Sequence, residues 1–330
     1  MSEVHDILAK FKLSNGFVTG GDDAPPVHRL PTGSPSLDKA LDGGIPKGMI
    51  TTVVGEPSMG KTTLCISAAI QAQRAGKHVI WHDTEYKMNG DHAIRQGFNP
   101  DLASIIRSTS IEEAADMMIE VLAKKGDDIG LIVWDSIAQS FSMRSMAKTN
   151  AEGAMASSEA GAFSRSWPRL QSMLYAKGVP MLCTNQFRIK GIGGSFTWKD
   201  QYGGGIIRYA PAVIIWFTGF EKIIRGDIPR GQQTAFKIQK SQTSTPFLEG
   251  KFEIDYDEET GWYGISFVGD LALMGLDTGI VKKAGAWYSY EDIKGQGVSN
   301  FKNELMARPD LIEKLRLVLI PDIEYASISD

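Results

Sequence analysis

Apolar blocks the length of a strand alternate with helical patterns along the first two thirds of the chain. Several of the strand-like blocks are almost wholly apolar, as expected for strands buried on both faces of a sheet. The blocks are residues 49–54, 78–83, 104–107, 130–135, 179–184 and 212–218, and helical patterns occupy 61–75, 111–125 and much of 155–176. Because the two kinds of element alternate, the pattern predicts an α/β core with a mainly parallel sheet.

The pattern changes after Gly219, where strand-like blocks follow one another without helices between them. These blocks are residues 233–240, 250–256 and 261–267, and an acidic turn separates the last two. Strands joined by short turns pair antiparallel, so we expect an antiparallel edge on the sheet. From about Leu271 onward the pattern predicts a small α-rich unit, with helices near 298–307 and 309–319.

The first residues of the chain have a short amphipathic pattern. Over residues 2–12 the side chains of Val4, Ile7, Leu8 and Phe11 fall on one helical face, and a polar linker rich in Gly and Pro follows. A helix this short is marginally stable alone, so its apolar face is expected to dock on something. Docking on the core of the same chain and docking elsewhere both fit the pattern.

Composition narrows the class of protein. The chain has 330 residues, of which 42% are hydrophobic, and a formal net charge of −4. No apolar run approaches the ~18 residues of a membrane span, and the N-terminus lacks the basic and apolar regions of a signal peptide. Cys65 and Cys183 fall in predicted buried elements without metal-ligand spacing, which favours a reducing, cytoplasmic setting. Any nucleic-acid binding would have to come from a local basic patch.

Residues 55–62 read Gly-Glu-Pro-Ser-Met-Gly-Lys-Thr and satisfy the phosphate-loop pattern G-x-x-x-x-G-K-[ST]. A strand pattern precedes the loop and a helical pattern follows it, so backbone N–H groups would converge on a phosphate. In this chemistry Lys61 reaches the β- and γ-phosphates and the Thr62 hydroxyl is a Mg²⁺ ligand. The predicted nucleotide contacts are Gly55, Glu56, Pro57, Ser58, Met59, Gly60, Lys61, Thr62 and Thr63.

Two further predicted strands end in acids. Asp135 ends the apolar strand 130–135, where a carboxylate would orient Mg²⁺ beside the phosphate loop. The strand after the phosphate-loop helix runs into Asp83-Thr84-Glu85, from which a carboxylate could deprotonate a water that attacks the γ-phosphate. Both acids could instead be solvated strand ends.

The segment 187–205 follows the strand end Asn185-Gln186 and is rich in glycine. It carries Arg188, Lys190 and Lys199 among the aromatic residues Phe187, Phe196, Trp198 and Tyr202. Basic and aromatic side chains on a flexible loop suit single-stranded nucleic acid, because charges follow phosphates and rings stack on bases. An ordinary mobile surface loop is the alternative, although long structureless loops are uncommon unless functional.

These motifs together resemble the RecA family of recombinases, including bacterial RecA and the phage UvsX-like members. The resemblance runs from about residue 30 to 319 and is carried by residues 31–38, 55–62, 83–85, 133–136, 185–188, 283–290 and 295–297. The block 283–297 lies outside the ATPase core and is the most specific. The resemblance implies a P-loop NTPase core at 30–268, an N-terminal polymerisation arm and linker at 1–29, and a C-terminal domain at 269–330.

The resemblance also implies roles for single residues. Glu85 matches the carboxylate that activates water, and Gln186 matches the residue that senses the γ-phosphate and couples it to the segment 187–205. Lys240 matches a lysine that reaches the nucleotide of the neighbouring subunit, whereas the family's second such lysine is replaced by Gln242. Residues 1–18 match the arm that packs on the next protomer. The positions that match the adenine contacts are Asn89, His92 and Tyr263.

The expected DNA contacts include residues of a second segment, 143–160, which matches the family poorly. The basic candidates in and after this segment are Arg144, Lys148, Arg165 and Arg169, and Arg208 follows the glycine-rich segment. The implied cofactors are ATP and Mg²⁺. The implied partners are single- and double-stranded DNA, further copies of the chain in a filament, and accessory single-strand-binding and loader proteins, with no membrane.

The resulting hypothesis is a cytoplasmic DNA-dependent ATPase that forms ATP-bound helical filaments on single-stranded DNA and catalyses homologous pairing and strand exchange. Lys61, Glu85, Gln186 and Lys240 would be its catalytic residues. One alternative is a ring-forming helicase with the same core. Another is a nucleotide-binding scaffold that does not turn ATP over, against which Glu85 argues.

Overall fold

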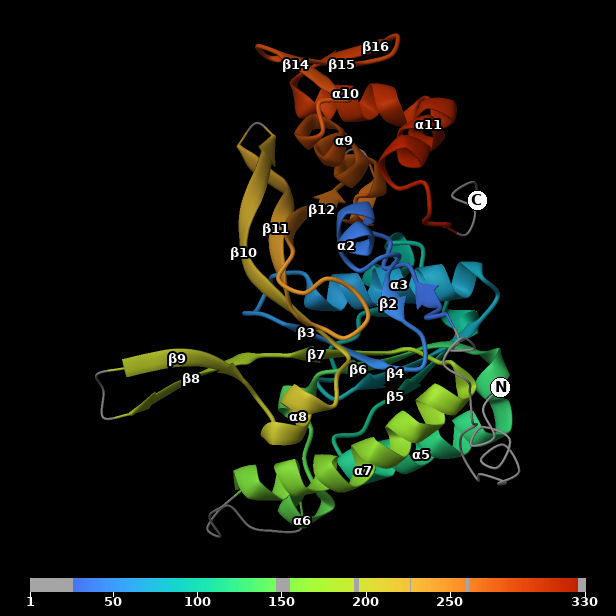
Figure 1. Cartoon of the computed structure of the whole chain (residues 1–330), viewed down its shortest axis with the longest axis vertical. Helices are drawn as coiled ribbons and strands as arrows, with labels where there is room; N and C mark the ends of the chain where they lie inside the picture. The colour runs from blue at the N-terminus through green and yellow to red at the C-terminus, as the bar shows by residue number, and fades with distance from the viewer. Residues whose placement is uncertain (1–25, 147–154, 193–195, 226, 259–260, 326–330) are drawn as a thin grey trace, which may run out of the picture.

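A nine-stranded sheet lies at the centre of the computed structural model, which describes residues 26–146, 155–192, 196–225, 227–258 and 261–325 (Figure 1). The strand order is β13-β12-β11-β10-β3-β7-β6-β4-β5. The helix predicted at 2–12, the linker after it and part of the segment 143–160 lie outside the described residues.

The larger part of the sheet is parallel, as the alternating sequence pattern predicts. Each neighbouring pair from β10 to β5 is parallel. All six predicted strands of this part are confirmed, with β10 extending well beyond its predicted end. They are β3 (Ile50–Val54), β4 (His78–Asp83), β5 (Ala103–Ile106), β6 (Ile129–Asp135), β7 (Met181–Asn185) and β10 (Val213–Arg225).

The other end of the sheet is antiparallel, which confirms the expectation from the unbroken run of strands. The antiparallel strands are β11 (Ile228–Ser241), β12 (Glu249–Asp257) and β13 (Trp262–Ile265). The strands β10 and β11 form a long ribbon that continues past the sheet and rises beside the C-terminal unit (Figure 1).

Helices cover both faces of the sheet (Figure 1). In β6 the side chains of Leu131 and Val133 join the core under α3, whereas those of Ile132 and Trp134 join the core under α5 and α7. This alternation follows the two-residue period of a strand and explains why the strand is apolar at almost every position. The helices on the two faces are α2 (Pro35–Ala40), α3 (Lys61–Arg74) and α4 (Gly90–Arg95), and α5 (Ile111–Lys125) and α7 (Met155–Lys177).

The expectation of a structureless loop at 187–205 is wrong. The segment forms an antiparallel hairpin of β8 (Phe187–Ile192) and β9 (Phe196–Gln201), which projects from the core (Figure 1), followed by the short helix α8 (Gly205–Tyr209). Backbone pairing from Phe187↔Gln201 to Ile192↔Phe196 satisfies the N–H and C=O groups that a loop would leave to water. The glycines that suggest a loop do not prevent this pairing.

The C-terminal unit contains the two predicted helices and further elements that the sequence pattern does not predict. A three-stranded antiparallel sheet precedes the helices, and its strands of three or four residues are too short to stand out by alternation. Leu271, Phe301, Leu305 and Leu315 are buried in a core of its own. The elements are α9 (Phe267–Asp277), β14 (Lys282–Ala284), β15 (Trp287–Tyr290), β16 (Ile293–Gln296), α10 (Gly297–Met306) and α11 (Pro309–Leu319).

The smaller elements of the described fold are β1 (Arg29–Leu30), β2 (Ile45–Pro46), α6 (Met143–Met146) and the 3-10 helices η2 (Pro100–Leu102), η3 (Gly126–Asp128) and η4 (Ile137–Gln139). In the ranges that the structure describes, no helix combines the length and apolarity needed to span a bilayer.

Candidate nucleotide site and neighbouring hairpin

The phosphate loop joins β3 to α3 and is braced from the antiparallel side of the sheet. Gln232 Nε2 donates to the Ser58 carbonyl at 3.2 Å, and Thr234 Oγ1 donates to the Met59 carbonyl at 3.2 Å. Gly60 has a φ of +87°, and a Cβ there would lie 2.2 Å from Ile254 Cδ1. The loop therefore needs glycine at this position for both its backbone conformation and its contact with β12.

Lys61 begins α3 and turns back over the loop. Its Nζ donates to the carbonyl oxygens of Gly55 at 2.9 Å and Glu56 at 2.8 Å. Burial lowers the pKa of Lys61, and the negative charges of Asp135 and Glu85 act in the opposite direction. The amide N–H groups at the start of α3 point toward the same region, so the loop and helix offer an anion site.

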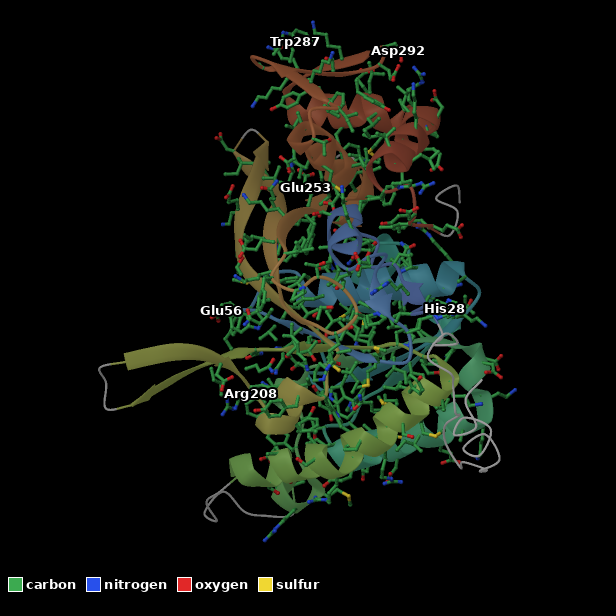
Figure 2. All side chains as sticks on the ribbon, viewed as in Figure 1. His28, Glu56, Arg208, Glu253, Trp287 and Asp292 are labelled. Atoms are coloured by element: carbon green, nitrogen blue, oxygen red, sulfur yellow. The ribbon has the colours of Figure 1, made fainter. Side chains whose placement is uncertain are left out.

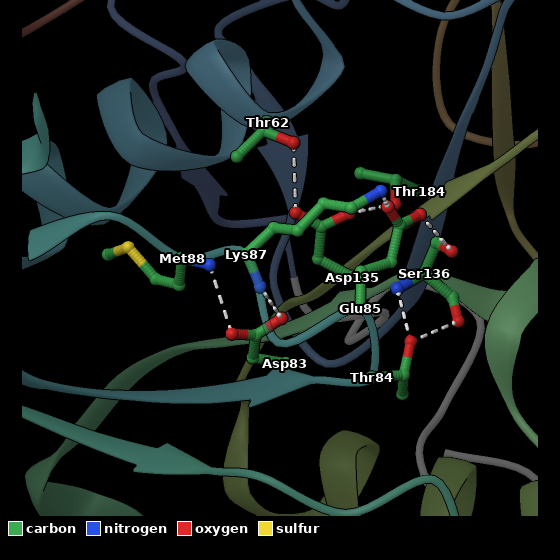
Figure 3. Close-up of polar contacts among 9 residues, drawn as sticks. All are labelled: Thr62, Asp83, Thr84, Glu85, Lys87, Met88, Asp135, Ser136 and Thr184. Carbon is green, nitrogen blue, oxygen red and sulfur yellow. Dashed lines mark hydrogen bonds and ion pairs between the residues drawn. The ribbon is translucent and has the colours of Figure 1, made fainter.

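Asp135 ends β6 opposite the start of α3 (Figure 3). Its Oδ2 accepts a hydrogen bond from Thr62 Oγ1 at 2.9 Å, and its Oδ1 accepts one from Thr184 at the end of β7. Burial raises the pKa of Asp135, and the two hydrogen bonds partly offset this effect. The sequence motifs predict that the Thr62 hydroxyl and the Asp135 carboxylate both act at a Mg²⁺ site. In the structure these two groups are hydrogen-bonded to each other.

Glu85 lies just past the end of β4, and both of its carboxylate oxygens accept hydrogen bonds (Figure 3). Ser136 Oγ donates to Oε1 at 2.8 Å, and Lys87 Nζ donates to Oε2 at 2.9 Å. Burial alone would raise the pKa of Glu85, but the contacts with Lys87 and Ser136 outweigh it and lower the pKa. The side chain is thus held as a carboxylate near Asp135.

A cavity of about 410 Å³ joins these groups into one site. Of the predicted residues, those that line it are Pro57, Ser58, Gly60, Lys61, Thr62, Thr63, Glu85, His92, Asp135 and Gln186. The other three residues predicted in this loop, Gly55, Glu56 and Met59, do not line the cavity. The carboxylate, ammonium, hydroxyl and amide groups that the sequence places on four separate segments therefore share one cavity.

Two predicted adenine contacts lie beside this cavity. Tyr263 lines a neighbouring cavity of about 120 Å³, which shares Gly264 with the larger one, and its ring lies 5.7 Å from the Arg95 guanidinium carbon. Asn89 caps α4 by accepting a hydrogen bond from the His92 amide at 3.2 Å. Asn89 thus positions the helix that carries His92.

Sequence reasoning missed a second group of cavity residues. Most of them lie on the antiparallel strands. The alternation of apolar and polar residues in a strand shows which positions share a face, but it does not show that this face reaches the phosphate loop. Lys87 could have been found, because it follows Glu85 by two residues in a segment already expected at the site. The missed residues are Lys87, Gln232, Ile254, Asp255, Tyr256 and Gly264.

Lys240 does not line the cavity. Its Nζ donates to three backbone carbonyls around the end of α8: those of Arg208 at 3.4 Å, Tyr209 at 2.9 Å and Pro211 at 2.7 Å. Burial lowers the pKa of Lys240. The ammonium group is therefore tied to the segment that follows the hairpin β8–β9.

Arg188 and Arg208 lie at the base of the hairpin and contact neighbouring side chains. The guanidinium carbon of Arg188 is 3.9 Å from the centre of the Tyr202 ring, and Arg208 Nη1 is 3.6 Å from Asp200 Oδ2. Lys190, Phe196 and Lys199 lie on β8 and β9, and their side chains are outside the described part of the structure.

Of the remaining DNA candidates, Arg144 lies on α6, Lys148 falls outside the described residues, and Arg165 and Arg169 lie on α7 and contact α5. Arg165 Nη2 is 3.5 Å from Glu112 Oε1, and Arg169 Nη1 is 3.2 Å from Asp116 Oδ1. Both arginine side chains are largely exposed, so these ion pairs leave the guanidinium groups accessible to a further partner.

Two family models together match almost the whole chain. Residues 4–261 match the model of the RecA N-terminal domain, and residues 269–319 match that of the RecA C-terminal domain. The Protein RecA of Kineococcus radiotolerans is 33% identical over 90% of this chain and 83% of its own length. The Protein RecA of Streptomyces coelicolor is 33% identical over 88% of this chain and 76% of its own, and that of Frankia alni 30% identical over 94% and 90%. With the phosphate loop, Asp135 and Glu85 around one cavity, this chain belongs to the RecA family of recombinases.

Proposed function

We propose that this RecA-family recombinase, a DNA-dependent ATPase of recombination and repair, hydrolyses ATP with Glu85 as general base and Lys61 as the main phosphate-binding cation. One observation carries the proposal: both side chains line the same cavity as the phosphate loop. The lowered pKa of Glu85 keeps it ionised and able to accept a proton from water. The N-terminal end of α3 and the Lys61 ammonium would stabilise the phosphate oxygens.

Oxygen ligands at the site suit Mg²⁺. The Thr62 hydroxyl and the Asp135 carboxylate already lie at hydrogen-bond distance, and hydroxyl and carboxylate oxygens are the donors that this hard cation prefers. Thr62 would bind the ion, and Asp135 would orient it. When bound, Mg²⁺ neutralises negative charge on the phosphates. Asp135 also keeps Thr62 and Thr184 in place through its two oxygens.

DNA binding in this scheme depends on the hairpin β8–β9, with Arg188, Lys190, Phe196 and Lys199 as its contacts and Gln186 as the link to the nucleotide. Gln186 lines the cavity, and its carbonyl accepts a hydrogen bond from the Tyr202 amide at 3.2 Å at the base of the hairpin. A change at the γ-phosphate can therefore reach the hairpin through one residue.

Filament formation would use the N-terminal arm, residues 1–18. An apolar groove of about 560 Å³ lies between α5 and the edge strand β5, and its lining includes Ile106, Met117 and Val121. Met117 and Val121 are partly exposed there, which is unusual for large apolar side chains in a cluster. We propose that the apolar face predicted at residues 2–12 of a second copy occupies this groove.

The finer features of the assembly follow from the same scheme. The unit 1–29 would be the arm and linker, 30–268 the ATPase core and 269–330 the C-terminal domain. Lys240 would approach the nucleotide of the neighbouring protomer. Single-strand-binding and loader proteins would be accessory partners, and the protein would act in the cytoplasm.

The test compares ATP binding and hydrolysis in Glu85→Gln and Lys61→Ala, with and without single-stranded DNA. Glu85→Gln keeps the size of the side chain but removes the base, so hydrolysis should fall by about 10²-fold or more while ATP still binds. Lys61→Ala should lose tight ATP binding. Glu313→Gln, an exposed carboxylate on α11 that lines neither the cavity nor the groove, is the matched control. Wild-type hydrolysis by Glu85→Gln would disprove the assigned role.

A further inference from the structure

Lys87 is a second lysine of the nucleotide cavity, and its place next to Glu85 gives it a specific contact. Its Nζ lies 2.9 Å from Glu85 Oε2, and both side chains line the cavity (Figure 3). The Lys87 side chain is 78% exposed, whereas that of Glu85 is 21% exposed. The carboxylate is therefore held in the wall of the site, and the ammonium group lies on its open side.

The backbone beneath Lys87 is fixed. Asp83, at the buried end of β4, accepts hydrogen bonds from the amide of Lys87 at 3.2 Å and from the amide of Met88 at 3.0 Å. These contacts hold the turn after Glu85 against the sheet. The side chain of Lys87 can thus change partner while its Cα stays at the rim of the cavity.

The two lysines of the cavity differ in how their donors are used. Lys61 donates to two loop carbonyls, so much of its hydrogen-bonding capacity is spent within the loop. Among the described residues, the only hydrogen bond of the Lys87 ammonium is the one to Glu85. An ammonium group carries three N–H donors, so Lys87 can bind a second acceptor without leaving Glu85.

We propose that Lys87 binds the γ-phosphate of ATP and at the same time orients Glu85 toward the attacking water. This inference rests on the proposed role of Glu85 as general base. Glu85 takes a proton from the water, whose oxygen bonds to the γ-phosphorus, and the bond from that phosphorus to the bridging oxygen breaks with its electron pair leaving on ADP. Lys87 donates to a γ-phosphate oxygen and to Glu85 Oε2, so base and phosphate are held at a fixed separation.

An ordinary surface ion pair is the competing explanation for the contact. Exposed Lys–Glu pairs contribute little to stability, and removing one would leave catalysis unchanged. Lys124 provides the matched case, because its Nζ lies 2.6 Å from Glu120 Oε1 on the exposed side of α5, outside the nucleotide cavity.

The first experiment measures kcat and KM for ATP, in the presence of single-stranded DNA, in Lys87→Met, Lys87→Arg and the control Lys124→Met. Methionine keeps the apolar stem and removes the charge, so kcat/KM should fall about 10-fold or more. Arginine keeps the charge and should restore much of the loss. Lys124→Met should match the wild type. Equal kinetics in Lys87→Met and the wild type would overturn the proposal.

The second experiment separates a phosphate contact from an effect that passes only through Glu85. In a Glu85→Gln background, which binds ATP without turning it over, Lys87→Met should weaken ATP binding about 10-fold and change ADP binding much less. Equal loss for ATP and ADP, or no loss for either, would overturn the contact with the γ-phosphate. If Glu85→Gln itself hydrolysed ATP at the wild-type rate, the proposed function would fail instead.

Discussion

Two lysines pair with carboxylates in very different parts of this protein. Lys87 is exposed at the rim of the nucleotide cavity, and the one carboxylate that its ammonium group contacts among the described residues is Glu85. Lys302, on α10, is 2% exposed and lies 3.1 Å from Glu253 Oε2 and 2.7 Å from Asp255 Oδ2, both on β12. The ring of Trp262 also covers the ammonium of Lys302, at 5.1 Å. Figure 2 shows Glu253 where the C-terminal unit meets the sheet.

The two clusters show that burial decides what a lysine–carboxylate pair does. The buried pair at Lys302 holds two parts of the fold together, whereas the exposed pair at Lys87 is free to bind a ligand. Taking charges out of water is costly, so the groups around Lys302 cannot separate without leaving an unpaired charge inside the protein. The Lys87 pair remains in contact with water and can gain a phosphate at little cost. Both clusters reach the same cavity, because Asp255 also lines it. The C-terminal unit is therefore joined by charge to a strand of the nucleotide site.

Removing the buried charge should have the largest effect on stability. Lys302→Met leaves Glu253 and Asp255 as buried carboxylates without their cation, so we expect a loss of about 3–5 kcal/mol in the free energy of unfolding. Urea unfolding followed by circular dichroism measures it. The equivalent change at the rim, Lys87→Met, should leave the urea midpoint close to that of the wild type, because this ammonium group is exposed to water.

A matched variant tests the reason for that loss. Adding Glu253→Gln and Asp255→Asn to Lys302→Met removes the unpaired charges while keeping similar volumes, so most of the lost stability should return. If the triple variant is as unstable as Lys302→Met, packing of the lysine stem against Trp262 is responsible, and the contrast between the two clusters is one of packing and not of charge.

Sequence predicted the phosphate half of the cavity because its groups are fixed by local chemistry. Lys61 and Thr62 follow a loop whose pattern specifies their directions, and Asp135 and Glu85 come at the ends of strands that a parallel sheet brings to one edge. The sequence therefore predicted that these residues lie at the same site without any knowledge of how the strands pair.

The other half of the cavity and the buried lysine could not be predicted from the sequence. Gln232, Ile254 and Tyr256 reach the site only through the registers of β11 and β12, which depend on pairing between distant segments. Lys302 lies in the amphipathic helix α10. A lysine in such a helix usually marks the side that faces solvent, so its burial could not be expected from the sequence. The hairpin at 187–201 was missed although its pairing is local, because its glycines and charges are typical of loops.

Asp38 is a buried carboxyl group for which the structure shows no lysine partner among the described residues, and it extends the comparison because its effect on stability should depend on pH. Asp38 is buried and accepts hydrogen bonds from the Thr32 amide at 2.7 Å and from the Tyr325 hydroxyl at 2.9 Å. Burial raises its pKa to about 6, and these hydrogen bonds only partly offset the effect. Because the folded state then holds a proton that the unfolded state releases, the contribution of Asp38 to stability is greatest below pH ~4 and is lost as the pH rises through about 6.

Asp38→Asn removes that titration and should therefore flatten this part of the stability curve. The shift corresponds to roughly 3 kcal/mol between the two ends of the range. Unfolding free energies of wild type and variant, measured by urea titration between pH 4 and 7, give the difference. A difference that does not vary with pH would show that Asp38 is ionised throughout this range in the folded protein.

Gln186 tests whether the cavity and the hairpin are coupled, with a smaller expected effect. Asn185 Nδ2 donates to the Tyr202 carbonyl at 2.9 Å and the Gln186 carbonyl accepts from the Tyr202 amide, so the end of β7 is bonded twice to Tyr202 at the hairpin base. Gln186→Ala should keep nucleotide binding but lose a coupling of about 1–3 kcal/mol between ATP and DNA. The measurement is DNA affinity with ADP and with a non-hydrolysable ATP analogue. A variant that keeps the full difference between the two nucleotides would make Gln186 only a strand end.

The smallest effect on stability is expected at the exposed ion pair of Arg169 and Asp116, whose Nη1 and Oδ1 atoms lie 3.2 Å apart. This pair also allows the comparison to be extended to DNA binding. Both Arg169→Ala and Asp116→Asn break this ion pair, so each should change the free energy of unfolding by less than about 1 kcal/mol. Only the loss of the arginine removes a cation that can contact a phosphate. Arg169→Ala should therefore reduce the slope of log affinity against log salt for single-stranded DNA by about 0.7, while Asp116→Asn leaves it unchanged. Equal slopes in the two variants would make Arg169, like Lys124, a surface charge without a DNA partner, because only a phosphate contact releases counterions on binding.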